Sequence, residues 1–164
     1  MSAGLITVAL ADEAATEALG RRLASRLQTP QLIFLRGELG AGKTTLCRGF
    51  LRGLGYAGLV KSPTYTLCET YAVADVQCLH CDFYRLAHAE EMEYLGLREQ
   101  FSGNRVVLIE WPEIAAEVLP APDIDILLSF DAGARIARLY VGTARGEVAL
   151  ADVEQARCGE HNLK

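Results

Sequence analysis

The chain has 164 residues and a mass of 17.8 kDa, a length that suits one domain with a buried core. Its residues are 51% apolar and 23% charged, which excludes a disordered chain and a collagen-like repeat. A formal net charge of -5 disfavours unaided binding to a nucleic-acid backbone, because such binding depends on clustered lysine and arginine.

No apolar run approaches the ~18 residues that a membrane-spanning helix needs, and the start of the chain lacks the features of a signal peptide. The five cysteines, at positions 47, 68, 78, 81 and 158, are odd in number and scattered. This distribution favours a reducing compartment over a disulfide framework. We therefore expect a single domain over residues 1–164, located in the cytoplasm, with a frayed tail from about residue 150.

The first half of the chain alternates between helical and strand patterns. Apolar side chains recur every four residues between Asp12 and Pro30, which predicts an amphipathic helix. Asp12 is expected to cap this helix, and Pro30 prevents its continuation. The apolar run at residues 31–36 predicts a buried strand, followed by a glycine-rich loop and a helix over residues 43–54.

The second half is richer in strands. Strand patterns cover residues 62–71, 76–83, 105–110, 124–130 and 135–141; a short helix is expected at 90–95, and another after Gly146. Buried strands that alternate with helices predict an α/β fold with a mostly parallel central sheet and antiparallel additions.

The strongest motif is a phosphate-binding loop. The segment GELGAGKT at residues 37–44 has the pattern G-x-x-x-x-G-K-T, after a predicted strand and before a predicted helix. Its glycines let backbone N–H groups surround phosphate oxygens, and the helix N-terminus adds a positive dipole. Lys43 is expected to contact the β- and γ-phosphates, and the Thr44 hydroxyl to bind Mg²⁺. This context favours a three-layer sandwich of the P-loop NTPase type over a chance glycine-rich turn.

Two carboxylates are expected at the same edge of the sheet. Glu110 closes the apolar strand VVLIE, and Asp82 ends the run CLHCD. A P-loop needs such groups to hold the metal and to orient water, although either residue can also be read as a solvated strand-end carboxylate. Trp111, after Glu110, is compatible with a place in the core or over the nucleotide.

Two further segments have competing interpretations. Ser62-Pro63-Thr64-Tyr65 lies where NTPases often carry a mobile switch segment, but the residues alone favour a plain proline turn. Cys78-x-x-Cys81, with a histidine between the cysteines, looks like half a zinc site. No second ligand pair is present in the sequence, so a strand facing the core is favoured.

Taken in order, the motifs resemble the bacterial TsaE (YjeE) family, small ATPases of tRNA threonylcarbamoyladenosine biosynthesis. They are GELGAGKTT (37–45), KSPTYTL (61–67), Glu69, HCDFYRL (80–86), EEMEYLGL (90–97) and LIEWPE (108–113). Asp12, Glu13, Thr16, Gly20 and Arg135 also fit, so the resemblance covers about residues 6–141. The chain departs from the family pattern at Cys81, which occupies the free position of the H-x-D motif, and residues 150–164 match no known motif.

The resemblance implies ATP and Mg²⁺ as cofactors, with weak hydrolysis by the protein alone. It also implies action on the TsaB–TsaD pair, which attaches threonylcarbamoyl to adenosine 37 of ANN-decoding tRNAs, so that tRNA is reached only indirectly. The implied phosphate cradle is Gly37, Gly40, Ala41, Gly42, Lys43, Thr44 and Thr45. Thr44, Glu110 and Asp82 are implied at the metal, and Lys43, Asp82 and Glu110 in catalysis. Thr64 and Trp111 are implied near the γ-phosphate, and Glu13 and Arg135 near the adenine and ribose.

Other P-loop functions remain in competition. A small-molecule kinase is the main alternative, but the arginines are scattered and the Tyr84-Arg85 region is too short for a separate lid. A GTP switch is disfavoured because the sequence has no Asn-Lys-x-Asp motif. A nucleotide-binding module without hydrolysis stays open.

Overall fold

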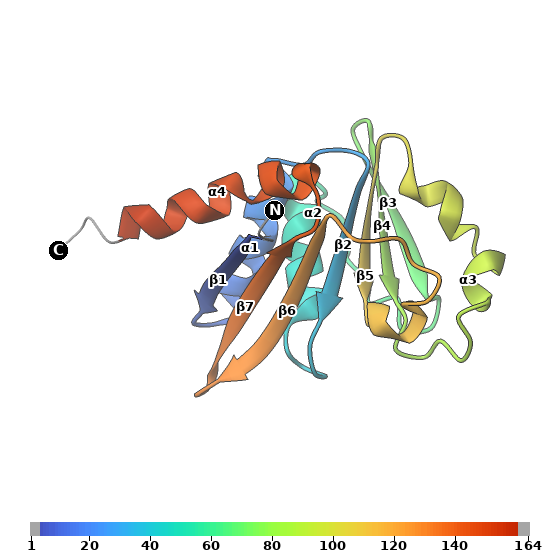
Figure 1. Ribbon diagram of the computed structural model, residues 1–164, viewed down its shortest axis with the longest axis horizontal. Coiled ribbons are helices and arrows are strands. Elements are labelled where there is room, and N and C mark those ends of the chain that lie inside the picture. Colours follow the sequence, from blue (N-terminus) through green and yellow to red (C-terminus); the bar gives the residue numbers. More distant parts are fainter. Residues whose placement is uncertain (1–3, 161–164) are drawn as a thin grey trace.

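The computed structural model describes residues 4–160, of which 152 and 154–160 are described through the backbone alone. Within this range, seven strands form one sheet in the order β1-β7-β6-β2-β5-β4-β3 (Figure 1). The strands are β1 (Leu5–Leu10), β2 (Gln31–Arg36), β3 (Cys68–Val73), β4 (Val76–Asp82), β5 (Arg105–Glu110), β6 (Ile124–Asp131) and β7 (Ala134–Val141). The helices are α1 (Glu13–Ser25), α2 (Lys43–Leu54), α3 (Glu91–Tyr94) and α4 (Ala144–Glu160), with 3-10 helices η1 (Leu97–Phe101) and η2 (Pro112–Ala115).

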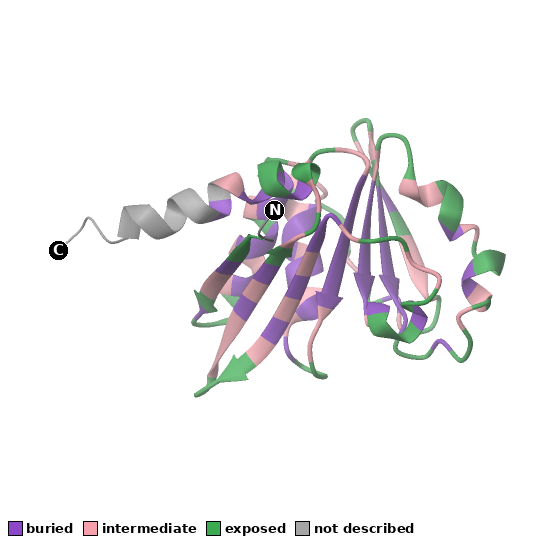
Figure 2. Cartoon of the chain, viewed as in Figure 1, coloured by how far each residue is buried: buried purple, intermediate pink, exposed green. Residues whose placement is uncertain are grey.

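The centre of the sheet is parallel and its margins are antiparallel. Strands β6, β2, β5 and β4 run parallel to one another, whereas β3 pairs antiparallel with β4, and β7 pairs antiparallel with both β6 and β1. The apolar runs of β2 and β5 occupy the centre because both of their faces are covered there (Figure 2). The mostly parallel α/β sheet with antiparallel additions is confirmed.

Alternate side chains of the central strands enter two cores on opposite faces of the sheet. Ile33 and Leu35 belong to the core that α1, α2 and α4 cover. Leu32 and Phe34 belong to the core that α3 and η1 cover. This alternation follows from the two-residue period of a strand. The sheet is therefore the middle layer of a three-layer sandwich, as predicted.

Helices α1 and α2 pack closely because glycines lie at their contact. A Cβ atom on Gly20 would overlap the Leu46 carbonyl oxygen, and one on Gly49 would overlap the backbone of Glu17. Helix α1 starts as predicted, since the Asp12 carboxylate accepts a hydrogen bond from the backbone N–H of residue 15 at 2.8 Å. This packing fixes the position of α2, the helix that follows the glycine-rich loop, relative to α1.

Three segments differ from the prediction. Residues 62–67 are not a strand, because Pro63 lacks an N–H donor and Leu67 has a φ of 63°, so pairing with β4 begins only at Cys68. Strand β1 was not predicted; its pattern is short, and it is an edge strand that pairs with β7 and buries Ile6 and Leu10 in the core. Helix α4 is not frayed at residues 149–153, because Ala149, Leu150 and Val153 are buried in the core with α1. The backbone stays helical to Glu160, and residues 161–164 of the predicted tail lie outside the described residues.

The cysteines also differ from the expectation of free thiols. Cys68 and Cys81 lie opposite each other on β3 and β4 and form a disulfide. The antiparallel hairpin brings the two together, and a scattered spacing in the sequence does not reveal this. Cys78 and Cys81 face opposite cores, as expected for residues three apart in a strand, and Cys47 and Cys78 are buried free thiols.

None of the helices within residues 4–160 combines the length and the apolar character that a membrane crossing requires.

The glycine contact between α1 and α2 can be tested by substitution. We expect Gly49→Ala to lower the free energy of unfolding by about 2–3 kcal/mol, because its Cβ would meet the backbone of Glu17, which cannot move aside. Urea unfolding measures the effect, with Gly4→Ala as control, since a Cβ there meets nothing closer than 3.5 Å. Equal midpoints for the two variants would contradict this packing.

Candidate functional site

The glycine-rich loop lies at the carboxyl edge of the central strands, between β2 and α2. Two pockets, of about 510 and 430 Å³, open beside it and share Gly40, Gly42 and Thr45 in their walls. The larger pocket extends toward the ends of β4 and β5. The smaller one extends toward the start of α1 and the β6–β7 hairpin. The loop therefore has a polar hollow on each side.

The larger pocket brings together the predicted phosphate and metal residues. Asp82 and Glu110 are paired in register at the ends of β4 and β5. Glu110 is only 3% exposed, and its Oε1 accepts a hydrogen bond from Thr44 Oγ1 at 2.9 Å. Thr64 and Trp111 line the same pocket. Carboxylate and hydroxyl oxygens are the ligands that Mg²⁺ prefers, so Thr44, Glu110 and Asp82 fit that ion.

Lys43 is buried at the mouth of this pocket. Its Nζ donates hydrogen bonds to the carbonyl oxygens of Gly37 and Glu38, at 2.7 and 2.9 Å, and lies 4.4 Å from the Trp111 ring centroid. These two bonds leave one ammonium proton for a ligand. Burial lowers the pKa of Lys43, and the nearby Glu110 carboxylate acts in the opposite direction. Trp111 thus covers the lysine at the edge of the pocket and does not belong wholly to the core.

Asp82 is a buried carboxylate beside the same space. Only 8% of the residue is exposed, and burial raises the pKa of its carboxyl group. A hydrogen bond from the Tyr84 backbone N–H to Oδ1, at 3.0 Å, acts in the opposite direction. A carboxyl group with a raised pKa in a pocket is a candidate for proton transfer.

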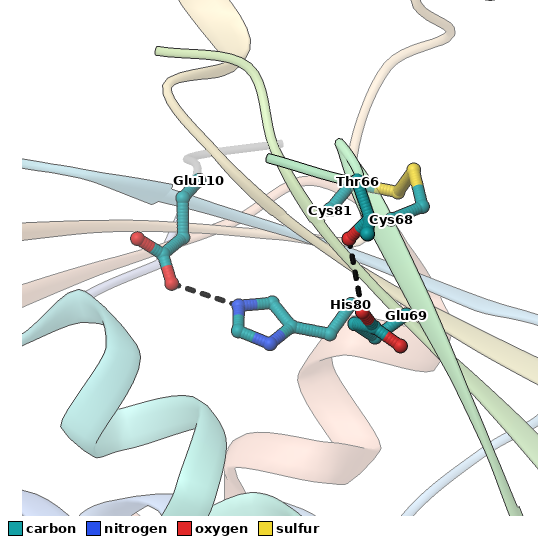
Figure 3. Close-up of a disulfide and its surroundings, with 6 residues drawn as sticks. All are labelled: Thr66, Cys68, Glu69, His80, Cys81 and Glu110. Atoms are coloured by element: carbon teal, nitrogen blue, oxygen red, sulfur yellow. Dashed lines mark hydrogen bonds and ion pairs between the residues drawn. A yellow bond between two sulfur atoms is a disulfide. The ribbon is translucent and has the colours of Figure 1, made fainter. Parts of the chain in front are cut away.

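His80 is a site residue that the sequence reasoning did not assign. Its ring is fully buried, and Nε2 lies 2.8 Å from Glu110 Oε1 (Figure 3). The Sγ atom of Cys47 lies 4.0 Å from the same oxygen. Donor atoms of these three residues lie within 4.8 Å of one another. His80 therefore faces the Glu110 carboxylate. The two-residue strand period, which places His80 on the face of Asp82, was the available signal.

The smaller pocket contains the residues predicted for adenine and ribose. Arg135, from the β6–β7 hairpin, donates a hydrogen bond from Nη2 to the Gly40 carbonyl oxygen at 3.2 Å. Glu13 lines the pocket and forms an ion pair with Arg48 at 2.6 Å. Ala41 lies on the loop side of the same pocket. Both predicted residues therefore lie beside the loop, on the side away from Glu110.

Gly37 lines neither pocket. Its φ is 142°, and a Cβ atom would overlap the Leu128 carbonyl oxygen on β6. Gly37 therefore allows the loop to pack on the sheet, and its own carbonyl oxygen holds Lys43.

The 62–67 segment borders the larger pocket. Ser62 and Thr64 line it, and their hydroxyl oxygens are 2.8 Å apart. Tyr65 is 88% exposed, and its ring centroid lies 5.2 Å from the guanidinium carbon of Arg85. The segment joins β3 through Leu67, whose carbonyl oxygen accepts a hydrogen bond from the Asp82 N–H at 2.8 Å. It is therefore a partly exposed loop beside the predicted γ-phosphate position.

The chain resembles known proteins in sequence and in fold. Residues 10–137 match the family model described as threonylcarbamoyl adenosine biosynthesis protein TsaE. A Haemophilus influenzae protein named tRNA threonylcarbamoyladenosine biosynthesis protein TsaE is 41% identical over 147 residues, which are 87% of this chain and 93% of that protein. The Bacillus subtilis protein of the same name is 38% identical over 113 residues, 69% of this chain and 70% of its own. A crystal structure of Bacillus subtilis YdiB has a TM-score of 0.82 at 26% identity, covering 96% of this chain and 99% of that one.

The burial of Asp82 predicts a stability change that depends on pH. Because the pKa of Asp82 is raised in the folded state, its ionised form destabilises the fold at neutral pH. We expect Asp82→Asn to raise the melting temperature at pH 7 by a few degrees. This gain in melting temperature should shrink as the pH falls through the raised pKa of Asp82. It should vanish below the ordinary pKa of an aspartate.

Thermal unfolding between pH 4 and pH 8 measures this, with Asp75→Asn at the exposed β3–β4 turn as control. A melting temperature that is lower than that of the unsubstituted protein at pH 7 would contradict the prediction.

Proposed function

The chain belongs to the TsaE family of threonylcarbamoyl adenosine biosynthesis proteins, and we propose that it binds and hydrolyses ATP with Mg²⁺ to support threonylcarbamoyl modification of tRNA. The observation that carries the proposal is the hydrogen bond between Thr44 and Glu110. It joins the first turn of α2 to the end of β5 at the predicted metal position. The tRNA site is adenosine 37 of ANN-decoding tRNAs, as the family resemblance implies.

The two pockets suit the two ends of the nucleotide. We expect the triphosphate to lie along the glycine-rich loop, where backbone N–H groups and the α2 dipole favour phosphate oxygens. The adenosine would then enter the smaller pocket between Glu13 and Arg135, and the γ-phosphate the larger one. The remaining Lys43 proton would bond a phosphate oxygen.

Side chains of the larger pocket would hold Mg²⁺ and orient water. The ion neutralises charge on the β- and γ-phosphate oxygens when it is bound. Thr44 Oγ1 and the Glu110 carboxylate would hold it, with His80 fixing the orientation of Glu110 through Nε2. Asp82, a buried pocket carboxylate whose pKa is raised by burial, would orient the attacking water and accept its proton.

A partner complex would complete the site. We propose the TsaB–TsaD pair as the partner, on the basis of the family resemblance. The net charge of -5 agrees with a route to tRNA through proteins. The partly exposed 62–67 segment is a place where a partner can order side chains around the γ-phosphate.

The lysine of the loop provides a direct test of nucleotide binding. We expect Lys43→Ala to weaken ATP affinity about 100-fold, because a charge-assisted hydrogen bond to the phosphates is lost. Thr44→Ala should chiefly remove the dependence of binding on Mg²⁺. Isothermal titration calorimetry measures both, with Lys61→Ala on the exposed surface as control. Unchanged affinity in Lys43→Ala would show that the loop does not hold the phosphates.

Multiple-turnover formation of threonylcarbamoyladenosine tests the complete proposal. We expect ATP hydrolysis to be slow alone and faster with TsaB–TsaD, and Glu110→Ala to lower the stimulated rate about 100-fold while the fold is retained. Glu113→Ala, a nearby carboxylate that is 42% exposed at its side chain, serves as control. Equal yield without this protein would reject the proposal. ADP release that requires a small-molecule acceptor would instead support the kinase alternative.

A further inference from the structure

The Cys68–Cys81 disulfide links the base of the 62–67 segment to the strand that carries Asp82 (Figure 3). Cys68 is the first residue of β3, directly after the segment, and Cys81 immediately precedes Asp82. We infer that this pair is a reversible thiol–disulfide site for low-molecular-weight thiols of the glutathione class, and that its oxidation slows nucleotide turnover. The effect on turnover rests on the proposed ATPase function; the thiol chemistry does not.

The strand pairing keeps the two cysteines adjacent in either redox state. They are register partners in the antiparallel β3–β4 ladder, with Cα atoms 4.1 Å apart. So short a separation is typical of the non-hydrogen-bonded pairs of such a ladder. The backbone hydrogen bonds of the hairpin, and not the disulfide alone, therefore determine their proximity. Reduction leaves the strands paired, and reoxidation needs no rearrangement.

The difference in exposure between Cys68 and Cys81 determines which thiol reacts first with a small disulfide. Cys68 is partly exposed, whereas Cys81 has no exposed surface. In the reduced protein, the Cys68 thiolate attacks one sulfur of a small disulfide RSSR and displaces one RS⁻. The Cys81 thiolate then attacks the Cys68 sulfur and displaces the second RS⁻. With the two protons released by the protein thiols, the products are one protein disulfide and two RSH; the reverse reaction restores the dithiol.

The other described cysteines do not compete. Cys47 and Cys78 have no exposed surface, so a small disulfide in solution cannot reach either sulfur. Cys78 faces the core opposite that of Cys81. The reactive pair is thus confined to the edge of the hairpin. In the reducing compartment that the composition predicts, disulfides that do form are usually transient and redox-sensing.

The cysteine pair is connected to the larger pocket through Leu67 and Asp82. Leu67 lies between Thr64 and Cys68, and its carbonyl oxygen accepts the hydrogen bond from the Asp82 N–H. In this disulfide-bonded state the Thr64 hydroxyl contacts Ser62 and no metal-site side chain. Thr64 lines the pocket that the γ-phosphate is proposed to enter, and the disulfide adds a covalent link at the first residue pair of the β3–β4 ladder, where its segment ends. Oxidation should therefore restrict movement of the 62–67 segment and slow turnover.

Redox titration of the full chain tests the chemistry. The protein is equilibrated in mixtures of reduced and oxidised glutathione and digested without reduction by a protease that cleaves after Glu69, which separates the two cysteines. We expect a linked Cys68–Cys81 peptide pair that forms and disappears reversibly. Absence of that linkage in every mixture, or a glutathione adduct on Cys68 that Cys81 never displaces, would overturn the inference.

ATP turnover with the partner complex tests the consequence. We expect oxidation to lower the rate about three-fold or more, with full recovery on reduction. Cys68→Ser and Cys81→Ala should remove the redox response, and Cys78→Ala on the same strand should retain it. Equal turnover in both states would overturn the regulatory inference.

Amide hydrogen exchange separates this inference from the proposed function. We expect exchange in residues 62–67 and at Asp82 to be slower in the oxidised protein, and this readout needs no hydrolysis. Absence of hydrolysis in both states would reject the proposed ATPase alone, and unchanged exchange would reject the redox restraint.

Discussion

The hydrogen bond between the Thr44 hydroxyl and the Glu110 carboxylate joins the helix that follows the glycine-rich loop to the centre of the sheet. Each partner is held by a different part of the fold. Thr44 belongs to the first turn of α2, whose position depends on glycine contacts with α1. Glu110 ends β5, which lies between β2 and β4 and is paired in parallel with both. The geometry of Thr44 and Glu110 therefore depends on how the helix layer packs on the sheet.

The site contains ionisable side chains whose neutral forms burial favours. Lys43 and Asp82 are both buried, and burial shifts the pKa of each toward its neutral form. Their mutual attraction, together with that of Glu110, acts against this shift for the lysine. Groups of this kind are expensive to bury unless they are paired, and they are characteristic of functional sites. Phosphates and a cation would provide the missing partners.

Successive side chains of β4 point to opposite faces of the sheet, so that the candidate metal-site residues lie on one face and the disulfide on the other. His80 and Asp82 lie on one face, where His80 contacts Glu110. Cys81 lies between them in the sequence and points to the opposite face, where it bonds Cys68. The metal-binding and thiol functions that we propose can thus occupy adjacent residues without sharing space. The 62–67 segment is the element that both reach, since it borders the pocket and continues into β3.

The sequence by itself determined the elements whose signals are local. Strand β2, helix α2 and the loop between them follow from an apolar run and the spacing of glycines with Lys43, and all three lie at the predicted residues. The common edge for Asp82 and Glu110 also follows, because parallel strands end together. Only the tertiary structure decided the contact of His80 with Glu110, the second pocket at Arg135, strand β1 and the Cys68–Cys81 bond. These depend on pairing between segments distant in the chain, and a local pattern carries no information about which distant residue it will face.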